Sequence, residues 1–199
     1  FIWEKGNRNE GFMTSSQVNY VARCGSFAES GYAYTGALRV FKPILGYDYL
    51  WLNVRVKGGA YGVMNSAGRS GEGYFVSYRD PNLKETDQVF EGVADYLEQF
   101  DADERDMTKY VIGTISDMDT PLLPPYKGAK AVSAWYSGIT DEMLAEERRQ
   151  VLAAQPEDIR ALAKIIRAIL STGSFCVVGN SEKIKENKEL FGSIKNLFN

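Results

Sequence analysis

Apolar residues change their spacing along this chain, and the changes predict an alternation of strands and helices. Around residues 13–22 apolar and polar positions alternate, as in a strand with one well-buried face. Residues 34–56 instead repeat apolar side chains every three or four positions, which predicts an amphipathic helix. Pro43 interrupts this second pattern, so we expect the helix to kink or divide there.

Gly58 and Gly59 mark the point where helical spacing gives way to strand spacing. The segments 60–68 and 73–81 flank a glycine-containing turn and predict a β-hairpin. The sequence SFCVVG, residues 174–179, predicts another short buried strand. The residues expected in the sheet are Val18, Tyr20, Val63, Phe75, Val76, Val177 and Val178.

The rest of the chain is predicted to be mainly helical. Helical spacing covers residues 86–99, 101–118, 126–137, 141–153, 156–171 and, with a polar face, 181–192. Three prolines between 121 and 125 are expected to form a rigid turn between two of these helices. The order of elements predicts a single α+β domain over residues 1–199. It would have two layers, a mostly antiparallel sheet and helices packed on one face.

Composition restricts the chemistry more than it restricts the fold. The net charge is −3, which argues against nucleic acid or an anionic membrane as the main partner. No apolar run is long enough to span a bilayer, so we expect a soluble chain. The sequence contains no histidine, the commonest metal ligand and general base. The usual zinc sites and catalytic triads are therefore not expected within this chain, and no metal ligands are assigned to it.

Several conspicuous side chains have a plain structural interpretation. Cys24 and Cys176 are interpreted as two buried free thiols, and Trp51 and Trp135 as core residues. The acidic residues Glu142, Glu146 and Glu147 are interpreted as a solvated helix face and not as a metal site. Arg79 and Asp80 are interpreted as an ion pair at a strand end, with a substrate contact as the alternative.

The segment RVKGGAY, residues 55–61, is the main candidate for chemistry. Arg55 is expected in the last helical turn, and Gly58 at the left-handed position that ends the helix. Tyr61 falls early on the next strand, so the guanidinium and the phenol can converge. Together they would form a donor pair suited to a peptide carbonyl or an oxyanion. A capped helix followed by a packed tyrosine explains the same residues without any function.

The backbone of the turn itself is a weaker candidate. Lys57, Gly58, Gly59 and Ala60 can present N–H and C=O groups to an extended peptide, as an edge strand does. A tight helix-to-strand turn explains the two glycines equally well.

Four stretches, in this order between Glu10 and Gly179, resemble the C-terminal domain of presequence proteases: EGFMTSSQVNYVARCG, YTGALRVFKPILGYDYLWLNVRVKGGAYG, YFVSYRDPNL and SDMDTPLLPPYKGAKA. These enzymes are metallopeptidases with an inverted zinc motif, a family that includes insulin-degrading enzyme and pitrilysin. The resemblance implies a clamshell of two halves that closes around unfolded oligopeptides in a chamber. It places zinc and its His-x-x-Glu-His motif in the N-terminal half and makes this chain the zinc-free last domain.

The resemblance also assigns roles within RVKGGAY. Tyr61 would stabilise the oxyanion of the tetrahedral intermediate, and Arg55 would hold the substrate backbone or the same oxygen. The partners it implies are the zinc-binding half of the same polypeptide and peptide substrates. The location would be the cytoplasm in a bacterium or an organellar matrix in a eukaryote. A non-catalytic structural or assembly homologue is one alternative, and an unrelated α+β binding module is another, which the sheet order would distinguish.

Overall fold

Six strands form one mixed sheet in the computed structural model, which describes residues 8–198. The strand order is β3-β4-β2-β5-β1-β6. The strands are β1 (Asn9–Thr14), β2 (Asn19–Ser26), β3 (Gly62–Ala67), β4 (Glu72–Asp80), β5 (Ser174–Asn180) and β6 (Ser193–Asn196). Antiparallel pairing joins β3 to β4, β4 to β2 and β2 to β5, whereas β1 runs parallel to both β5 and β6. The predicted hairpin and the predicted strand at 174–179 are confirmed.

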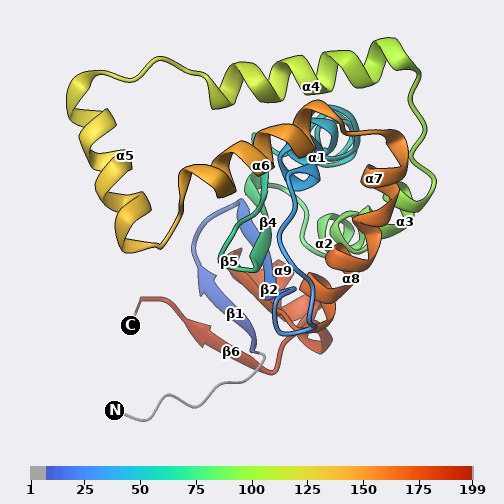
Figure 1. Ribbon diagram of the computed structural model, residues 1–199. Helices are drawn as coiled ribbons and strands as arrows, with labels where there is room; N and C mark the ends of the chain where they lie inside the picture. The colour runs from blue at the N-terminus through green and yellow to red at the C-terminus, as the bar shows by residue number, and fades with distance from the viewer. Residues whose placement is uncertain (1–7, 199) are drawn as a thin grey trace.

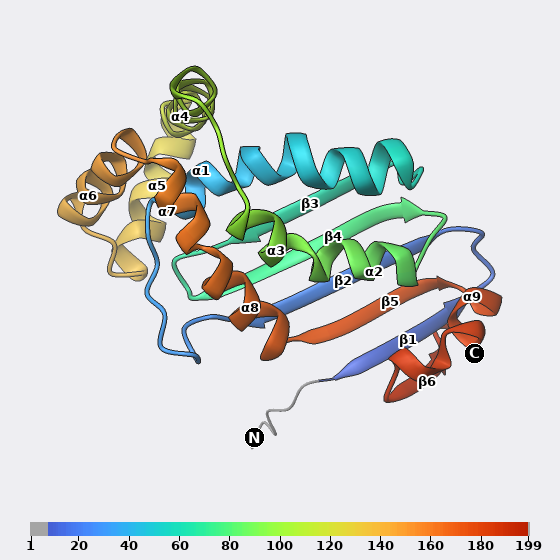
Figure 2. The same cartoon turned by 90° about the vertical axis from the view of Figure 1, so that its right-hand side faces the viewer.

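Helices cover one face of this sheet, as predicted, and most of them are seen above it in Figure 2. Alternate strand residues that point toward these helices, among them Val21, Phe75 and Val177, are almost completely buried. The helices are α1 (Ala37–Ile44), α2 (Lys84–Glu91), α3 (Val93–Glu98), α4 (Glu104–Met118), α5 (Pro124–Tyr136), α6 (Asp141–Leu152), α7 (Pro156–Ala161), α8 (Ala163–Ser171) and α9 (Ser181–Glu186). The α+β class and the two-layer arrangement are therefore confirmed.

Two predicted elements at the ends of the chain are wrong. The expected strand at 13–22 is divided between β1 and β2, because hydroxyl groups bond to the intervening backbone and form tight turns. Thr14 Oγ1 accepts the N–H of Ser16 at 3.1 Å, and Ser16 Oγ accepts the N–H of Val18 at 3.1 Å. Val18 thus lies in the turn and not in the sheet. The expected helix at 181–192 ends at Glu186, and a short 3₁₀ turn, η3 (Lys188–Leu190), leads into β6.

The helix that leads toward RVKGGAY is continuous but changes its geometry. After α1 it continues as two π-helical segments, η1 (Leu45–Tyr49) and η2 (Trp51–Lys57). Pro43 lies inside α1 and does not divide the helix. Proline removes one backbone donor, and the helix widens in the turns that follow it. The predicted helix at 34–56 is therefore confirmed, and of the two outcomes expected at Pro43, a kink or a division, the division is wrong.

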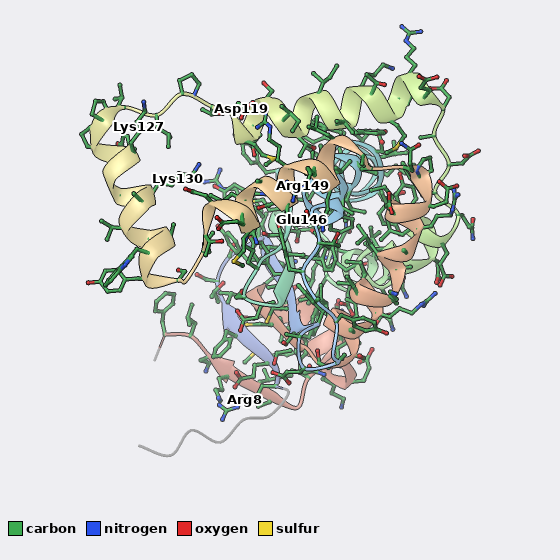
Figure 3. The ribbon with its side chains drawn as sticks, in the orientation of Figure 1. Arg8, Asp119, Lys127, Lys130, Glu146 and Arg149 are labelled. Carbon is green, nitrogen blue, oxygen red and sulfur yellow. The ribbon has the colours of Figure 1, made fainter. Side chains whose placement is uncertain are left out.

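In Figure 1, α4 runs along the top of the domain, α5 stands apart at the left, and α6 returns across the middle. None of the residues of α5 is buried, and Trp135 is 75% exposed, so its interpretation as a core residue is wrong. In Figure 3, Lys127 and Lys130 extend from α5, and Asp119 follows the end of α4.

The other face of the sheet carries side chains that the helices do not cover. Tyr20, Met64 and Tyr74 alternate with buried residues on their strands and are all exposed. Cys24 lies on this face and is exposed, while Cys176 is half-buried; both thiols are free. The prediction of two free cysteines is confirmed, but the prediction that both are buried is wrong.

Candidate functional site

The turn between η2 and β3 holds the two residues predicted to carry chemistry. Arg55 lies in the last turn of η2, as expected. Gly58 keeps right-handed helical geometry, with φ −80°, and the left-handed residue is Gly59, with φ +80°. The prediction for Gly58 is therefore wrong by one position. Gly58 is needed for another reason, because a Cβ there would lie 2.5 Å from the carbonyl oxygen of Val54.

The end of β4 holds this turn in place. Asn82 Nδ2 donates a hydrogen bond to the Gly58 carbonyl at 2.6 Å. The buried Asp80 carboxylate accepts hydrogen bonds from the Asn82 N–H at 2.9 Å and from Thr86 Oγ1 at 2.7 Å. Asn19 Nδ2 donates to the carbonyl groups of Asp80 and Asn82 at 3.1 and 3.2 Å. This network ties the turn to two neighbouring strands and fixes its geometry.

The same network corrects the interpretation of Arg79 and Asp80 as an ion pair. Asp80 points into the protein and its carboxylate is used by Asn82 and Thr86, while Arg79 is exposed. The sequence contained a signal for this, because an Asp side chain in a turn commonly accepts a hydrogen bond from the backbone N–H two residues later, which forms an Asx turn.

Arg55 packs on an aromatic ring. Its guanidinium carbon lies 3.9 Å from the centroid of the Trp51 ring, within the range of a cation–π interaction. Trp51 is 40% exposed, so its interpretation as a core residue is wrong. Among residues 8–198, no carboxylate forms an ion pair with Arg55. Its donors are therefore available to a ligand.

Tyr61 immediately precedes β3, which begins at Gly62, and it is 63% exposed. Its ring packs edge-on against the ring of Tyr78, with 5.5 Å between centroids, and its N–H donates to the Arg79 carbonyl at 3.3 Å. The phenol oxygen has no hydrogen-bond partner in the described part of the chain. None of the described contacts joins Arg55 directly to Tyr61; each is held by its own aromatic neighbour at the two ends of the turn.

The backbone of residues 57–60 is largely occupied. The Gly59 N–H donates to the Arg55 carbonyl at 2.9 Å, and the Ala60 N–H donates to Val54 at 3.1 Å. The Gly58 carbonyl is bound by Asn82, and the Lys57 ammonium donates to Asn53 Oδ1 at 3.3 Å. More unpaired backbone N–H and C=O groups are available to a peptide strand along β3, because β3 is an edge strand of the sheet.

A second cluster of charged side chains surrounds Glu147, far from the turn in sequence. Glu147 is buried, and its carboxylate accepts hydrogen bonds from Arg39, Arg69 and Tyr34. Burial raises the pKa of Glu147, but these hydrogen bonds outweigh it and hold the pKa below the ordinary value. Burial and the bond to Glu147 raise the pKa of Tyr34 to about 12.

Only part of the predicted solvated face on α6 is therefore exposed. Glu146 and Arg149 do lie on the surface of α6, where Figure 3 labels them, and they form an ion pair there. The prediction is wrong for Glu147, whose partners come from the segment before α1, from α1 itself and from the β3–β4 turn. All of the groups around Glu147 satisfy one another, so we assign the cluster to stability.

No group of three or more His, Cys, Asp or Glu residues within 8–198 could hold a metal ion. In the same part of the chain, no helix is both long and apolar enough to cross a membrane.

Residues 9–182 match a family model described as the PreP C-terminal domain. The chain belongs to this family. The suspected resemblance to presequence proteases is therefore confirmed, and the alternative of an unrelated binding module is wrong.

Relatives of this PreP C-terminal domain are much longer proteins. Protein HypA of Clostridium perfringens is 48% identical over 197 residues, which cover 99% of this chain and 20% of the relative. Presequence protease 1, chloroplastic/mitochondrial, of Arabidopsis thaliana is 35% identical over 89% of this chain and 16% of its own length. The chain thus spans about a fifth of the length of the curated relatives that it matches.

Solved structures of peptidase family M16 share the fold. The inactive M16 peptidase domain from Pseudomonas fluorescens superimposes with a TM-score of 0.61 at 14% identity. The match covers 90% of this chain and 46% of that one. The PreP C-terminal domain therefore has the architecture of an M16 peptidase domain.

We expect Asn82→Ala in the full-length protein to loosen the turn after Arg55. The substitution leaves the Gly58 carbonyl without its donor, which should cost about 1–2 kcal/mol of unfolding free energy. If the turn positions Arg55 and Tyr61, peptide turnover should also fall, by about tenfold for 1.4 kcal/mol of lost transition-state stabilisation. Urea unfolding and a peptide cleavage assay would measure the two effects.

Asn187→Ala is the matched control, because Asn187 Nδ2 also donates to a backbone carbonyl, that of Lys183, at 2.9 Å. We expect Asn187→Ala to lower the unfolding free energy by a similar amount and to leave peptide turnover unchanged. Equal turnover losses in both variants would show that Asn82 has no positioning role.

Proposed function

We propose that this PreP C-terminal domain is the zinc-free last domain of a metallopeptidase that degrades unfolded oligopeptides in a closed chamber. It would supply Arg55 and Tyr61 to an active site whose zinc is bound by the N-terminal half of the same polypeptide. Two findings support the proposal: the family match over residues 9–182, and relatives that are about five times as long as the aligned part. The described residues offer no set of zinc ligands, so the metal would be bound outside them.

The observation that carries the proposal is the pairing of two free donors across one fixed turn. Tyr61 is 63% exposed and Arg55 is half-buried, and neither side chain has a hydrogen-bond acceptor among the described residues. The Asn82 and Asp80 hydrogen bonds hold the backbone between them. Donors that are fixed before the reaction stabilise developing negative charge without a cost of reorganisation.

In the proposed reaction, each side chain acts on the carbonyl of the peptide bond that is cleaved. The Tyr61 hydroxyl would donate a hydrogen bond to the carbonyl oxygen as it gains negative charge. The guanidinium of Arg55 would bind the same oxygen or the neighbouring backbone carbonyl through its planar set of N–H groups. The β3 edge would contact the extended peptide, with a smaller contribution from the backbone of residues 57–60, most of which is already hydrogen-bonded.

The second candidate is a non-catalytic structural or assembly homologue. It is favoured by the structural neighbour from Pseudomonas fluorescens, which is named an inactive peptidase domain. Arg55 and Tyr61 favour the catalytic role, since a structural domain has no need for two unpaired donors at one turn. The proposed compartment is the cytoplasm in a bacterium or an organellar matrix in a eukaryote; HypA comes from a bacterium, and presequence protease 1 is named chloroplastic/mitochondrial.

We expect Arg55→Lys in the full-length enzyme to lower kcat/KM for a peptide by about tenfold or more. Lysine keeps the positive charge but loses the planar fork and its directed pair of hydrogen bonds. Arg105→Lys is the control, because Arg105 is an exposed arginine on α4. Zinc content should be unchanged in both variants. Full activity of Arg55→Lys would mean that Arg55 serves only as a helix-end cation.

A further inference from the structure

A β-bulge interrupts the pairing of β2 and β4 next to Tyr61. Asn19 is opposite Asp80 and Val21 is opposite Ser77, so two residues of β4, Tyr78 and Arg79, face the single residue between Asn19 and Val21. Arg79 has φ +50°, and it is the one non-glycine residue with positive φ in the part of the chain that the structure describes. Such a conformation is strained for a residue with a Cβ.

The bulge reverses the direction in which Arg79 and its neighbour point. Ser77 is fully buried on the helix-covered face, so regular alternation would place Arg79 on that face and Asp80 on the open one. The structure shows the opposite, with Asp80 fully buried and Arg79 exposed. Bulges commonly re-aim a side chain beside a functional site. Here the bulge redirects the side chain of Arg79, which carries a guanidinium group.

Arg79 lies beside a row of tyrosines on the open face of the sheet. Its guanidinium carbon is 5.8 Å from the Tyr61 ring centroid and 5.5 Å from that of Tyr78. The Tyr78 ring in turn lies 5.6 Å from the ring of Tyr20. Arg79 is therefore held next to the proposed catalytic phenol, on the same exposed surface.

Arg79 also lacks the counter-ion that most arginines of this chain have. Carboxylates pair with Arg23, Arg39, Arg69, Arg148, Arg149, Arg160 and Arg167. No carboxylate within residues 8–198 pairs with Arg79, and the adjacent Asp80 is committed to Asn82 and Thr86. A strained backbone thus presents an unpaired guanidinium to solvent beside Tyr61.

We propose that Arg79 binds a carboxylate of the peptide substrate, next to the bond that is cleaved. This inference rests on the proposed function and adds a specificity residue to the same site. A guanidinium held between two rings keeps its N–H fork free for a bidentate bond to a carboxylate. The carboxylate can come from the free C terminus of a peptide or from an Asp or Glu side chain.

The test measures peptide binding to the full-length protein from which zinc has been removed, so that no cleavage occurs. Two fluorescent peptide pairs are compared: a free against an amidated C terminus, and an internal Glu against Gln. The wild type should bind the carboxylate member of at least one pair about tenfold more tightly, as expected for a charge-assisted hydrogen bond. The pair that shows the preference identifies the source of the carboxylate.

Arg79→Gln should abolish that preference, and Arg105→Gln, the control, should retain it. A preference that survives Arg79→Gln, or no preference in the wild type, would overturn the proposal. This outcome is separate from the proposed function, which fails if Tyr61 and Arg55 variants keep full turnover.

Arg79→Gly separates binding from folding. Glycine adopts positive φ without strain, so the Tm should be unchanged or higher while the carboxylate preference is lost. A clear drop in Tm would show that the Arg79 side chain stabilises the fold, and the proposal would then be wrong.

Discussion

Tyr61→Phe in the full-length enzyme should lower turnover by about 100- to 1000-fold, the loss typical of removing one oxyanion donor. The ring can remain packed on Tyr78 and near Arg79, because phenylalanine keeps the same shape. Only the hydroxyl is lost, and it has no hydrogen-bond partner among the described residues, so stability should barely change. Steady-state kinetics with a quenched fluorescent peptide would separate a loss in kcat from a change in KM.

Tyr136→Phe is a suitable control, since Tyr136 is a 79% exposed tyrosine on α5. It should keep wild-type turnover. If Tyr61→Phe did the same, the phenol would have no part in catalysis, and the interpretation of Tyr61 as a packed strand residue would stand.

Glu147→Gln should produce the largest loss of stability among the substitutions considered for this chain, about 3 kcal/mol of unfolding free energy. The change leaves Arg39 and Arg69 without the buried carboxylate to which both donate. Because both arginines are partly exposed, the loss should lie near the lower end for a broken buried ion pair. Urea unfolding of the chain would measure it.

The exposed neighbour Glu146 provides the control. Its ion pair with Arg149 spans one helical turn at the surface, so Glu146→Gln should cost less than about 0.5 kcal/mol. A similar small effect for Glu147→Gln would show that the cluster around Glu147 contributes little to stability.

The same carboxylate predicts how stability depends on pH. The pKa of Glu147 in the folded protein is lower than the ordinary value of 4.5, so the folded state favours the ionised form. Its contribution is then fully present above the pKa of the unfolded chain and is lost as pH falls through the lower, folded pKa. Wild-type stability should fall in this acid range more steeply than that of Glu147→Gln, as unfolding curves at several pH values would show.

Local sequence patterns were sufficient for most elements of the fold. Helical spacing located α4 and α6, and the change of spacing after Gly58 located the hairpin. Parallel pairing of β1 with β5 and β6 was not accessible in this way. It joins residues more than 160 positions apart, and no local pattern specifies such a contact.

The candidate site was only partly predictable for the same reason. Arg55 and Tyr61 could be selected from the sequence because one short segment carries both, and their catalytic role is a proposal. Glu147 was misinterpreted because its partners Arg39 and Arg69 lie 108 and 78 residues away. The ion pair of Arg79 with Asp80 was misinterpreted because it requires both side chains on one side of the strand end, whereas the bulge leaves Asp80 buried and Arg79 exposed.

The π-helical segment that carries Arg55 allows the direction of this side chain to change by insertion or deletion, as well as by substitution. In a π-helix each hydrogen bond spans five residues instead of four, so every such turn contains an inserted residue relative to an α-helix. Deletion of one residue from η1 would return a turn to α geometry and rotate Trp51 and Arg55 about the helix axis. A deletion or insertion of one residue in this helix can therefore redirect the Arg55 guanidinium. Alignments of the family should be examined for gaps at 45–57 as well as for substitutions.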